Sequence, residues 1–339
     1  MQCSASPEPA SVADGADHVR APASVPFNRR FECTDADALA EHMTGWALQF
    51  DQLSPGPFHG TLHEIRVEGV QLLRERVDRA LLKRGAAAPR TTSISIALET
   101  AGTGFCGGTL LQDRIVLVSS GPSMPELRTP ERHDIAVLTV PTEALQALAS
   151  LDEADIDALA PGRTWLVKLS GPRYEALKAF VLTSFYNAER AHGALAWPQA
   201  CKTLHDALLL ELVDVARHPP EPACPNSAAR RRIVDRVREL AIAKQDAPLT
   251  VLDVCKAVGA SRRKLQYCFE ETLGTHPAYY LRVLRLNAVR RELRRHSPTT
   301  ACVSDIAYQW GFWHLSRFAT HYRQLFGELP SETLKRAPR

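Results

Sequence analysis

The chain has 339 residues, more than one hydrophobic core usually organises, so its length predicts two domains. Its 45% hydrophobic and 23% charged residues exclude a disordered, collagen-like or disulfide-scaffold protein. Forty-one Lys and Arg against 38 Asp and Glu give a net charge of +3, which taken alone indicates no nucleic-acid partner.

The first segment, 1–26, is rich in Ala, Ser and Pro, so we expect a disordered tail there. No apolar run reaches the length of about 18 residues that a membrane span needs, so we expect no membrane insertion. Eight cysteines occur without any C-x-x-C pair, which excludes a zinc ribbon or a thioredoxin-like motif and favours reduced, buried thiols.

Between 57 and 141 the sequence has the pattern of short β-strands. Apolar and small side chains alternate over 94–98, and β-branched apolar runs follow at 115–118 and 135–140. Several short strands at close spacing indicate a small barrel or jelly roll.

After residue 141 the apolar period becomes that of amphipathic helices, and the predicted fold class is therefore α+β. The predicted helices cover 142–160, 173–190 and 198–217. Four prolines in the ten residues from His218 to Ser227 end this pattern, and we interpret 218–229 as an interdomain linker. The first domain then covers 27–217 and the second 230–339.

The second domain contains an internal repeat of about 25 residues. The segment 253–259 (DVCKAVG) matches 305–311 (DIAYQWG), within copies that cover about 250–273 and 302–326. Further matched positions are Leu265 with Phe318, Phe269 with Tyr322, Leu273 with Phe326, Gly274 with Gly327 and Pro277 with Pro330. Such a duplication indicates one structural unit used twice.

Each copy predicts a short helix, a glycine turn and a second helix of about three turns. Gly259 and Gly311 stand where the first helix must end in a left-handed conformation. Thr250 and Asp253 form a capping box, and Ser261 is a good N-cap for the following helix. This is the helix-turn-helix pattern, although one copy alone fits an ordinary helical hairpin equally well.

Charge decides between these two interpretations. Residues 226–339 hold 21 Lys and Arg against 10 Asp and Glu, a net charge of +11, whereas residues 1–225 have a net charge of −8. A basic helical domain of this size has the electrostatic footprint of a DNA-binding protein. The opposite charges also predict an attraction between the two domains, which could restrain the DNA-binding face.

Between the copies, 277–296 predicts one helix that begins at a proline and extends about 30 Å. One turn of B-DNA is about 34 Å, so this spacer could place two recognition helices in successive major grooves. We interpret the arginines along it as a solvated face: Arg290, Arg291, Arg294 and Arg295.

The last 114 residues resemble the DNA-binding domain of the AraC/XylS family of bacterial transcription regulators. The resemblance rests on the spacing of apolar and glycine positions in both copies and on the F-G-x-x-P element at 326–330. The segments 285–293 (RLNAVRREL) and 309–315 (QWGFWHL) are most similar to the ethanolamine-operon activator branch.

The resemblance implies a cytoplasmic transcription activator, acting at the bacterial nucleoid, with a cupin-like sensing barrel in 27–217. Its implied partners are double-stranded promoter DNA, RNA polymerase, a small-molecule effector and a second copy of the chain. It implies no enzymatic activity and no cofactor.

The resemblance also assigns DNA contacts residue by residue. In the first copy these are Ser261, Arg262, Arg263, Lys264, Gln266 and Tyr267. In the second copy they are Leu315, Ser316, Arg317, Thr320 and Arg323. Leu315 stands where family members have polar residues, so we expect it to contact a thymine methyl group. His314 replaces the usual Ser cap.

Six polar or aromatic residues are candidates to line an effector pocket: Trp46, Phe50, Asp51, His59, His63 and Glu64. On a strand, His59 and His63 would lie about 13 Å apart, too far for one metal ion, so no metal site is predicted. Two alternatives stay open: a cupin-type metal enzyme that carries a DNA-binding domain, and a DNA-binding protein that responds to no ligand.

Overall fold

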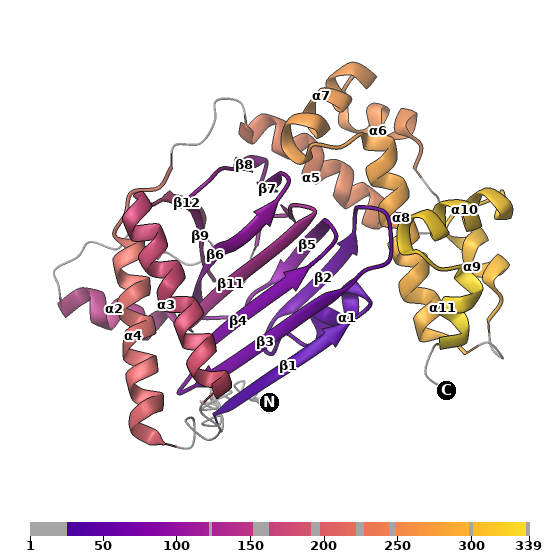
Figure 1. Cartoon of the computed structure of the whole chain (residues 1–339). Helices are drawn as coiled ribbons and strands as arrows, with labels where there is room; N and C mark the ends of the chain where they lie inside the picture. The colour runs from indigo at the N-terminus through magenta and orange to yellow at the C-terminus, as the bar shows by residue number, and fades with distance from the viewer. Residues whose placement is uncertain are drawn as a thin grey trace, which may run out of the picture.

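The computed structural model of the chain describes residues 26–121, 124–151, 163–190, 197–221, 227–243, 249–297 and 301–336. The predicted disordered tail lies outside the described residues, apart from Pro26. The chain forms an N-terminal region of antiparallel sheets with helices and an all-helical C-terminal region (Figure 1). The predicted α+β class is confirmed.

Two antiparallel sheets form the N-terminal domain. The larger has the strand order β1-β3-β4-β11-β6-β9-β12 and the smaller β2-β5-β10-β7-β8. The strands are β1 (Phe27–Cys33), β2 (Ala47–Gln52), β3 (Gly60–Val67), β4 (Val70–Val77), β5 (Leu81–Ala86), β6 (Thr91–Ala101), β7 (Gly104–Cys106), β8 (Thr109–Leu111), β9 (Ile115–Ser120), β10 (Leu127–Arg128), β11 (Arg132–Pro141) and β12 (Arg163–Lys168). The runs predicted from sequence lie in β6, β9 and β11, which are neighbours in the larger sheet. Its cupin-like character stays a prediction.

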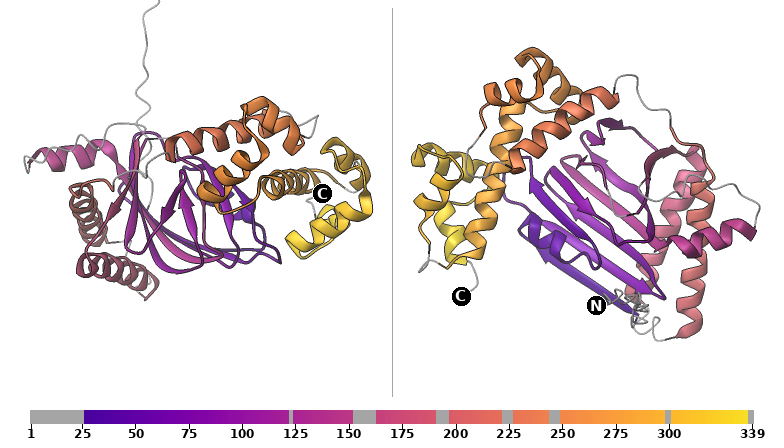
Figure 2. Two further views of the ribbon diagram at one scale, coloured as in Figure 1. Left: turned by 90° about the horizontal axis from the view of Figure 1, so that it is seen from above. Right: turned by 180° about the vertical axis from the view of Figure 1, so that it is seen from behind.

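Helices cover one face of the larger sheet (Figure 2). They are α2 (Thr142–Leu151), α3 (Gly171–Arg190) and α4 (Pro198–Ala216), and α1 (Ala36–Glu41) lies near the smaller sheet. Buried Ile94 and Leu138 of the sheet share one core with Leu177 of α3 and Leu212 of α4. The helices α3 and α4 therefore pack on the larger sheet.

Strand β12 was not predicted. It pairs with β9 and alternates buried Trp165 and Val167 with less buried neighbours, a two-residue period that the sequence does contain. The predicted helix over 142–160 is described only as far as Leu151, and its remainder lies outside the described residues.

Helices alone form the C-terminal domain. They are α5 (Ser227–Ala243), α6 (Val251–Val258), α7 (Arg262–Leu273), α8 (Pro277–Arg295), α9 (Val303–Gln309), α10 (Leu315–Phe326) and α11 (Pro330–Arg336). One core holds the second helices of both predicted copies together with α8, and it also includes Leu53, Ala80 and Leu82 of the N-terminal domain. The two domains are therefore joined by apolar packing as well as by the chain.

Among the described residues, Cys33, Cys106 and Cys268 are buried free thiols, Cys255 is a partly buried one and Cys302 an exposed one. Within the same part of the chain, no helix is both long and apolar enough to cross a lipid bilayer.

Candidate DNA-binding surface

The first helix-turn-helix consists of α6 and α7. The Thr250 hydroxyl accepts a hydrogen bond from the Asp253 backbone N–H, and the Asp253 carboxylate accepts one from the Thr250 N–H. Gly259 ends α6 with a φ of 64°, and the Ser261 hydroxyl accepts from the N–H of Lys264 at the start of α7. The predicted capping box, left-handed glycine and N-cap are all present, so the local sequence fixes this turn.

The second helix-turn-helix consists of α9 and α10 and differs at its caps. Gly311 has a φ of 74°, as the repeat predicts. His314 occupies the N-cap of α10 but makes no side-chain capping hydrogen bond. Next to this turn, Phe312 packs on Phe318, with ring centroids 5.0 Å apart, and this contact joins the turn to the buried face of α10.

The predicted DNA contacts lie on the solvent-exposed faces of the two motifs. All eleven side chains are exposed: Ser261, Arg262, Arg263, Lys264, Gln266, Tyr267, Leu315, Ser316, Arg317, Thr320 and Arg323. The opposite faces are buried in the domain core through Leu265 and Phe269 in α7 and Phe318 and Tyr322 in α10. Contact with DNA by these residues stays a prediction, and their exposure is the condition for it.

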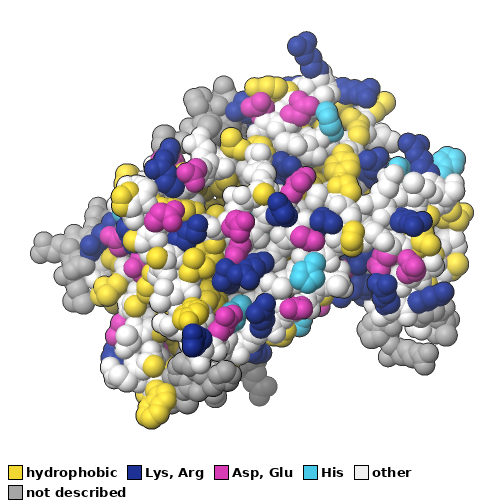
Figure 3. Space-filling view, in the orientation of Figure 1, with side chains coloured by type: hydrophobic (Ala, Val, Ile, Leu, Met, Phe, Trp, Pro, Cys, Tyr) yellow, Lys and Arg dark blue, Asp and Glu magenta, His cyan; other side chains and the backbone are white. Residues whose placement is uncertain are grey.

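Helix α8 separates the two motifs. Figure 1 shows α6 and α7 at one end of it and α9 and α10 at the other. Its 19 residues correspond to about 28 Å at 1.5 Å per residue. Figure 3 shows Lys and Arg side chains over both motif regions. The two exposed helix-turn-helices are therefore joined by a helix somewhat shorter than the roughly 34 Å of one turn of B-DNA.

Comparison with known proteins matches this domain to a family. A family model described as a helix-turn-helix domain matches residues 254–336. A probable thc operon regulatory protein of Rhodococcus erythropolis is 33% identical over 193 residues, 55% of this chain and 52% of that protein. A XylDLEGF operon transcriptional activator of Pseudomonas putida is 44% identical over 75 residues, 22% of this chain and 23% of that protein. The C-terminal domain is therefore similar to the helix-turn-helix domains of operon regulators of the AraC/XylS type.

Solved structures are similar to parts of the chain. A transcriptional regulator from Chromobacterium violaceum, described as an AraC-type DNA-binding domain-containing protein, has 31% identity and a TM-score of 0.30, covering 33% of this chain and 99% of that one. The chain spans about half the length of the Rhodococcus relative and about a quarter of the Pseudomonas activator.

Arginines of the AraC-type domain form ion pairs with the N-terminal domain, so their interpretation as a solvated face was wrong. Arg290 Nε lies 2.6 Å from Asp35 Oδ2, and Arg294 pairs with the same carboxylate. Burial raises the pKa of Asp35, but the two guanidiniums outweigh this, and the net pKa is lowered. Of this run, only Arg295 is exposed.

Arg291 forms the centre of a second ion-pair group. Its Nη1 lies 2.9 Å from Asp37 Oδ2 and 2.7 Å from Asp51 Oδ1, and the other Asp51 oxygen lies 2.5 Å from Arg84 Nη2. Burial lowers the pKa of Arg291, but Asp51 and Asp37 outweigh it, and the net pKa is raised. The domain attraction predicted from the −8 and +11 charges is thus realised in specific, largely buried contacts.

Uncharged hydrogen bonds reinforce the docking of the AraC-type domain. Gln52 ends the edge strand β2, and its backbone N–H donates to Asn287 Oδ1 at 2.9 Å, while Asn287 Nδ2 donates to the Gln52 carbonyl at 3.0 Å. The Gln52 side chain donates to the Leu325 carbonyl at 2.6 Å. The Asn287 side chain therefore pairs with the backbone N–H and C=O of Gln52, as the backbone of a neighbouring strand would.

The N-terminal domain touches both recognition helices at equivalent positions of the repeat. Gly274 and Gly327 end α7 and α10 in left-handed conformations, with φ of 56° and 76°. A Cβ on Gly274 would lie 2.5 Å from Arg128 and 3.0 Å from Phe105, and one on Gly327 would lie 2.9 Å from Pro57. Glycine therefore allows both the helix ends and the close domain contact.

A buried polar contact lies near the first motif. The Tyr280 hydroxyl donates to Glu126 Oε2 at 3.1 Å, and Arg238 Nη1 lies 3.8 Å from the same oxygen. Burial raises the pKa of Glu126 more than Arg238 lowers it. Sequence reasoning missed this carboxylate, because nothing local marks a partner 154 residues away.

The six effector candidates do not share one pocket. Trp46 and Glu64 belong to one network, since Trp46 Nε1 donates to Gln71 Oε1 and Gln71 Nε2 donates to Glu64 Oε1. Phe50 is buried between the sheets, where it lines a 30 Å³ space with Trp46. The others lie apart: Asp51 pairs with Arg84 and Arg291, His63 contacts Asn28 and Phe185, and His59 is exposed before β3.

An ion-pair group between the sheets was not anticipated. Lys83 Nζ lies 2.6 Å from both Glu75 oxygens, and His133 Nε2 lies 3.2 Å from Oε1 of the same residue. Burial raises the pKa of Glu75, but Lys83 and His133 outweigh it and hold the pKa at about 2. Among the described residues, no group of three or more His, Cys, Asp or Glu side chains is placed to hold a metal.

Proposed function

We propose that the protein is a sequence-specific DNA-binding transcription regulator that inserts α7 and α10 into successive major grooves. The observation that carries this proposal is the duplicated helix-turn-helix, whose recognition faces are both exposed and basic on opposite ends of α8. The match to operon regulators supports the same conclusion.

A mobility-shift titration of the full chain against promoter DNA tests the proposal. Binding should weaken steeply as salt rises, because counterions are released when Lys and Arg contact phosphates. If Arg263 forms two hydrogen bonds with one guanine, Arg263→Ala should weaken the free energy of binding to the specific site by about 1 to 3 kcal/mol and should reduce the preference for that base. The control Lys335→Ala removes an exposed cation from α11, outside the recognition helices.

Two outcomes would count against these assignments. Loss of affinity that is equal on specific and random DNA would make Arg263 a phosphate contact. Failure of the full chain to give any salt-sensitive complex would remove the proposed function itself.

We further infer that the regulator acts in the cytoplasm at the bacterial nucleoid, as a homodimeric activator that contacts RNA polymerase and has no enzymatic activity. The domain boundaries at 27–217, 218–229 and 230–339 belong to the same proposal, and α5 begins at Ser227, close to the proposed linker end. Sedimentation of the full chain with and without DNA tests the dimer.

Membership of the ethanolamine-operon branch is a narrower proposal, supported by the 285–293 and 309–315 segments. Ethanolamine with a cobalamin should then raise the melting temperature of the full chain, because a ligand that binds only the folded state stabilises it. An unchanged melting temperature at saturating concentrations would contradict the branch assignment.

A further inference from the structure

The turn of the second helix-turn-helix is one residue longer than the turn of the first, and backbone hydrogen bonds show which residue is added. In the first motif the Ala260 N–H donates to the Cys255 carbonyl at 3.1 Å. In the second motif the Phe312 N–H donates to the Ala307 carbonyl at 2.9 Å, and Ala307 is the counterpart of Cys255 in the repeat. Ala260 and Phe312 are therefore equivalent positions.

The N-caps of the two recognition helices mark the other end of each turn. The carbonyls of Ser261 and His314 each accept the N–H of the residue four positions later, at 2.9 Å in both motifs. Ser261 follows Ala260 directly, whereas Trp313 stands between Phe312 and His314. Trp313 is therefore the added residue, and the first motif has no counterpart of it.

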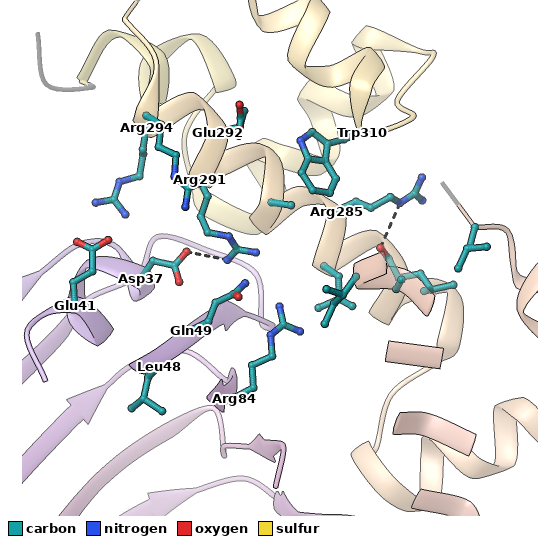
Figure 4. Close-up of a pocket in the computed structure, with 17 residues that line it drawn as sticks. Asp37, Glu41, Leu48, Gln49, Arg84, Arg285, Arg291, Glu292, Arg294 and Trp310 are labelled. Carbon is teal, nitrogen blue, oxygen red and sulfur yellow. Dashed lines mark hydrogen bonds and ion pairs between the residues drawn. The ribbon is translucent and has the colours of Figure 1, made fainter. Parts of the chain in front are cut away.

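The side chain of Trp313 faces solvent, unlike the aromatic residues just before it. Trp310 lies beside Arg285 in a cavity between the two domains (Figure 4), and Phe312 packs against the apolar core of the C-terminal domain. Trp313, in contrast, is 75% exposed. An indole at this exposure adds little to the stability of the fold and is a typical anchor of a binding surface.

Two more exposed apolar side chains accompany Trp313. The Tyr308 ring of α9 is 43% exposed, and its centroid is 6.1 Å from the centroid of the Trp313 ring. Leu315, the first residue of α10, is 36% exposed. We refer to Tyr308, Trp313 and Leu315 together as the apolar patch of the second motif.

The first motif carries cations at the positions equivalent to two of these residues. The repeat pairs Tyr308 with Lys256 and Leu315 with Arg262, and both of these cations are exposed. The first motif therefore presents positive charge where the second presents apolar surface. Two motifs that differ in this way suit two different half-sites.

The position of the apolar patch determines which partner it suits. Leu315 begins the predicted recognition helix α10, and the first residues of such a helix are the ones that contact base edges in the major groove. The apolar group that the major groove presents is the C5 methyl of thymine. Exposed apolar side chains at this point therefore match thymines of double-stranded DNA.

We propose that the apolar patch packs on thymine methyl groups in the half-site bound by the second motif, and that Trp313 provides most of this contact. The proposal rests on the regulator function proposed above and specifies the base that its second motif prefers. No charge takes part in the contact, so it is independent of counterion release. The first motif, with Arg262 and Arg263, binds its half-site through charge and through hydrogen bonds to guanine.

Unlike half-sites also fix the orientation of the bound chain. A site with a guanine-containing half and a thymine-containing half matches the two motifs in one direction only. The same chain placed in the reverse direction would set arginines against methyl groups and the apolar patch against guanine. The added Trp313 therefore makes the two copies of the repeat non-interchangeable on DNA.

Replacement of thymine by uracil tests the contact directly, because uracil differs from thymine only by the missing methyl group. The probe is the duplex that the full chain selects most strongly from a random-sequence pool, with each of its thymines replaced by uracil in turn. We expect at least one replacement in one half of the site to weaken binding about 4-fold, as loss of one buried methyl group does. In the Trp313→Ala variant the same replacement should have no effect.

The variant itself has two expected properties. Trp313→Ala should weaken binding to the selected duplex by about 10-fold or more, because a large aromatic contact is lost. The slope of log affinity against log salt should stay the same, since no phosphate contact is removed, whereas Arg262→Ala should make this slope shallower. The matched control Trp197→Ala removes an indole of similar exposure, 71%, from the N-cap of α4 and should change neither affinity nor slope.

Three results would overturn the proposal: no uracil replacement that weakens binding by the unchanged chain, equal affinity of Trp313→Ala and the unchanged chain for the selected duplex, or the same uracil effect in both. The first result needs no variant, so it is decisive whether or not a substitution disturbs folding. In each case a salt-sensitive mobility shift still shows DNA binding, and only the thymine contact is lost. Failure to select any duplex would remove the regulator function together with the contact.

Discussion

Replacing Asn287 by alanine should loosen the contact between the two domains. The side chain is 4% exposed and satisfies both the N–H and the C=O of Gln52. Removal leaves two buried backbone groups without partners, at about 1 to 3 kcal/mol each. Alanine has the higher helix propensity and returns about 0.5 kcal/mol. We therefore expect Asn287→Ala to reduce the free energy of unfolding by about 1.5 to 5.5 kcal/mol.

Denaturant unfolding of the full chain measures this loss, and hydrogen exchange at the Gln52 amide locates it. The control Gln266→Ala removes an amide from the exposed face of α7 and should change stability by less than about 0.5 kcal/mol. If Asn287→Ala costs no more than this control, or if the Gln52 amide stays equally protected, the hydrogen bonds across the contact do not stabilise docking and the reasoning is refuted.

Two further predictions concern the same contact. Burial raises the pKa of Glu126 above its usual 4.5, so the stability that this carboxyl contributes is fully present below pH 4.5 and is lost as pH rises through the raised pKa. Glu126→Gln should therefore make the free energy of unfolding less dependent on pH in this range. Parallel pH profiles for the variant and the unchanged chain would contradict the assignment. Gly327→Ala should lower stability more than Gly259→Ala. Both substitutions meet the left-handed penalty of about 1 to 2 kcal/mol, but a Cβ at Gly327 would also lie against Pro57, whereas a Cβ at Gly259 would meet no described residue within 4 Å beyond its own helix and chain neighbours. Equal losses in thermal or denaturant unfolding would show that Pro57 yields without cost.

The helix-turn-helix motifs could be predicted from sequence because their determinants are local. The Thr250 and Asp253 capping box, the Gly259 turn and the Ser261 cap each involve residues within a few positions of one another. Long amphipathic periods likewise predicted α3, α4 and α8 to within a few residues. Strand β12 was missed because a six-residue strand carries only a short alternation.

The domain contact could be predicted only as a net attraction. The charge difference indicated that the two domains attract, but Arg290 and Asp35 are 255 residues apart, and no local pattern selects that pairing. For the same reason the arginines of α8 could not be distinguished from a solvated face. Asp51 was singled out for a ligand pocket, whereas its carboxylate is occupied by Arg84 and Arg291.

The contacts at Gly274 and Gly327 impose a constraint on the length of α8. The N-terminal domain contacts the equivalent glycine of each repeat: Phe105 and Arg128 lie against Gly274, and Pro57 lies against Gly327. One residue added to or removed from α8 would rotate the second motif by about 100° and shift it by about 1.5 Å. That change would misplace Gly327 against Pro57 and also turn α10 relative to α7. The length of α8 must therefore fit two spacings at once: the spacing of the contacts on the N-terminal domain, and the spacing of the major grooves in the DNA that we propose the protein binds.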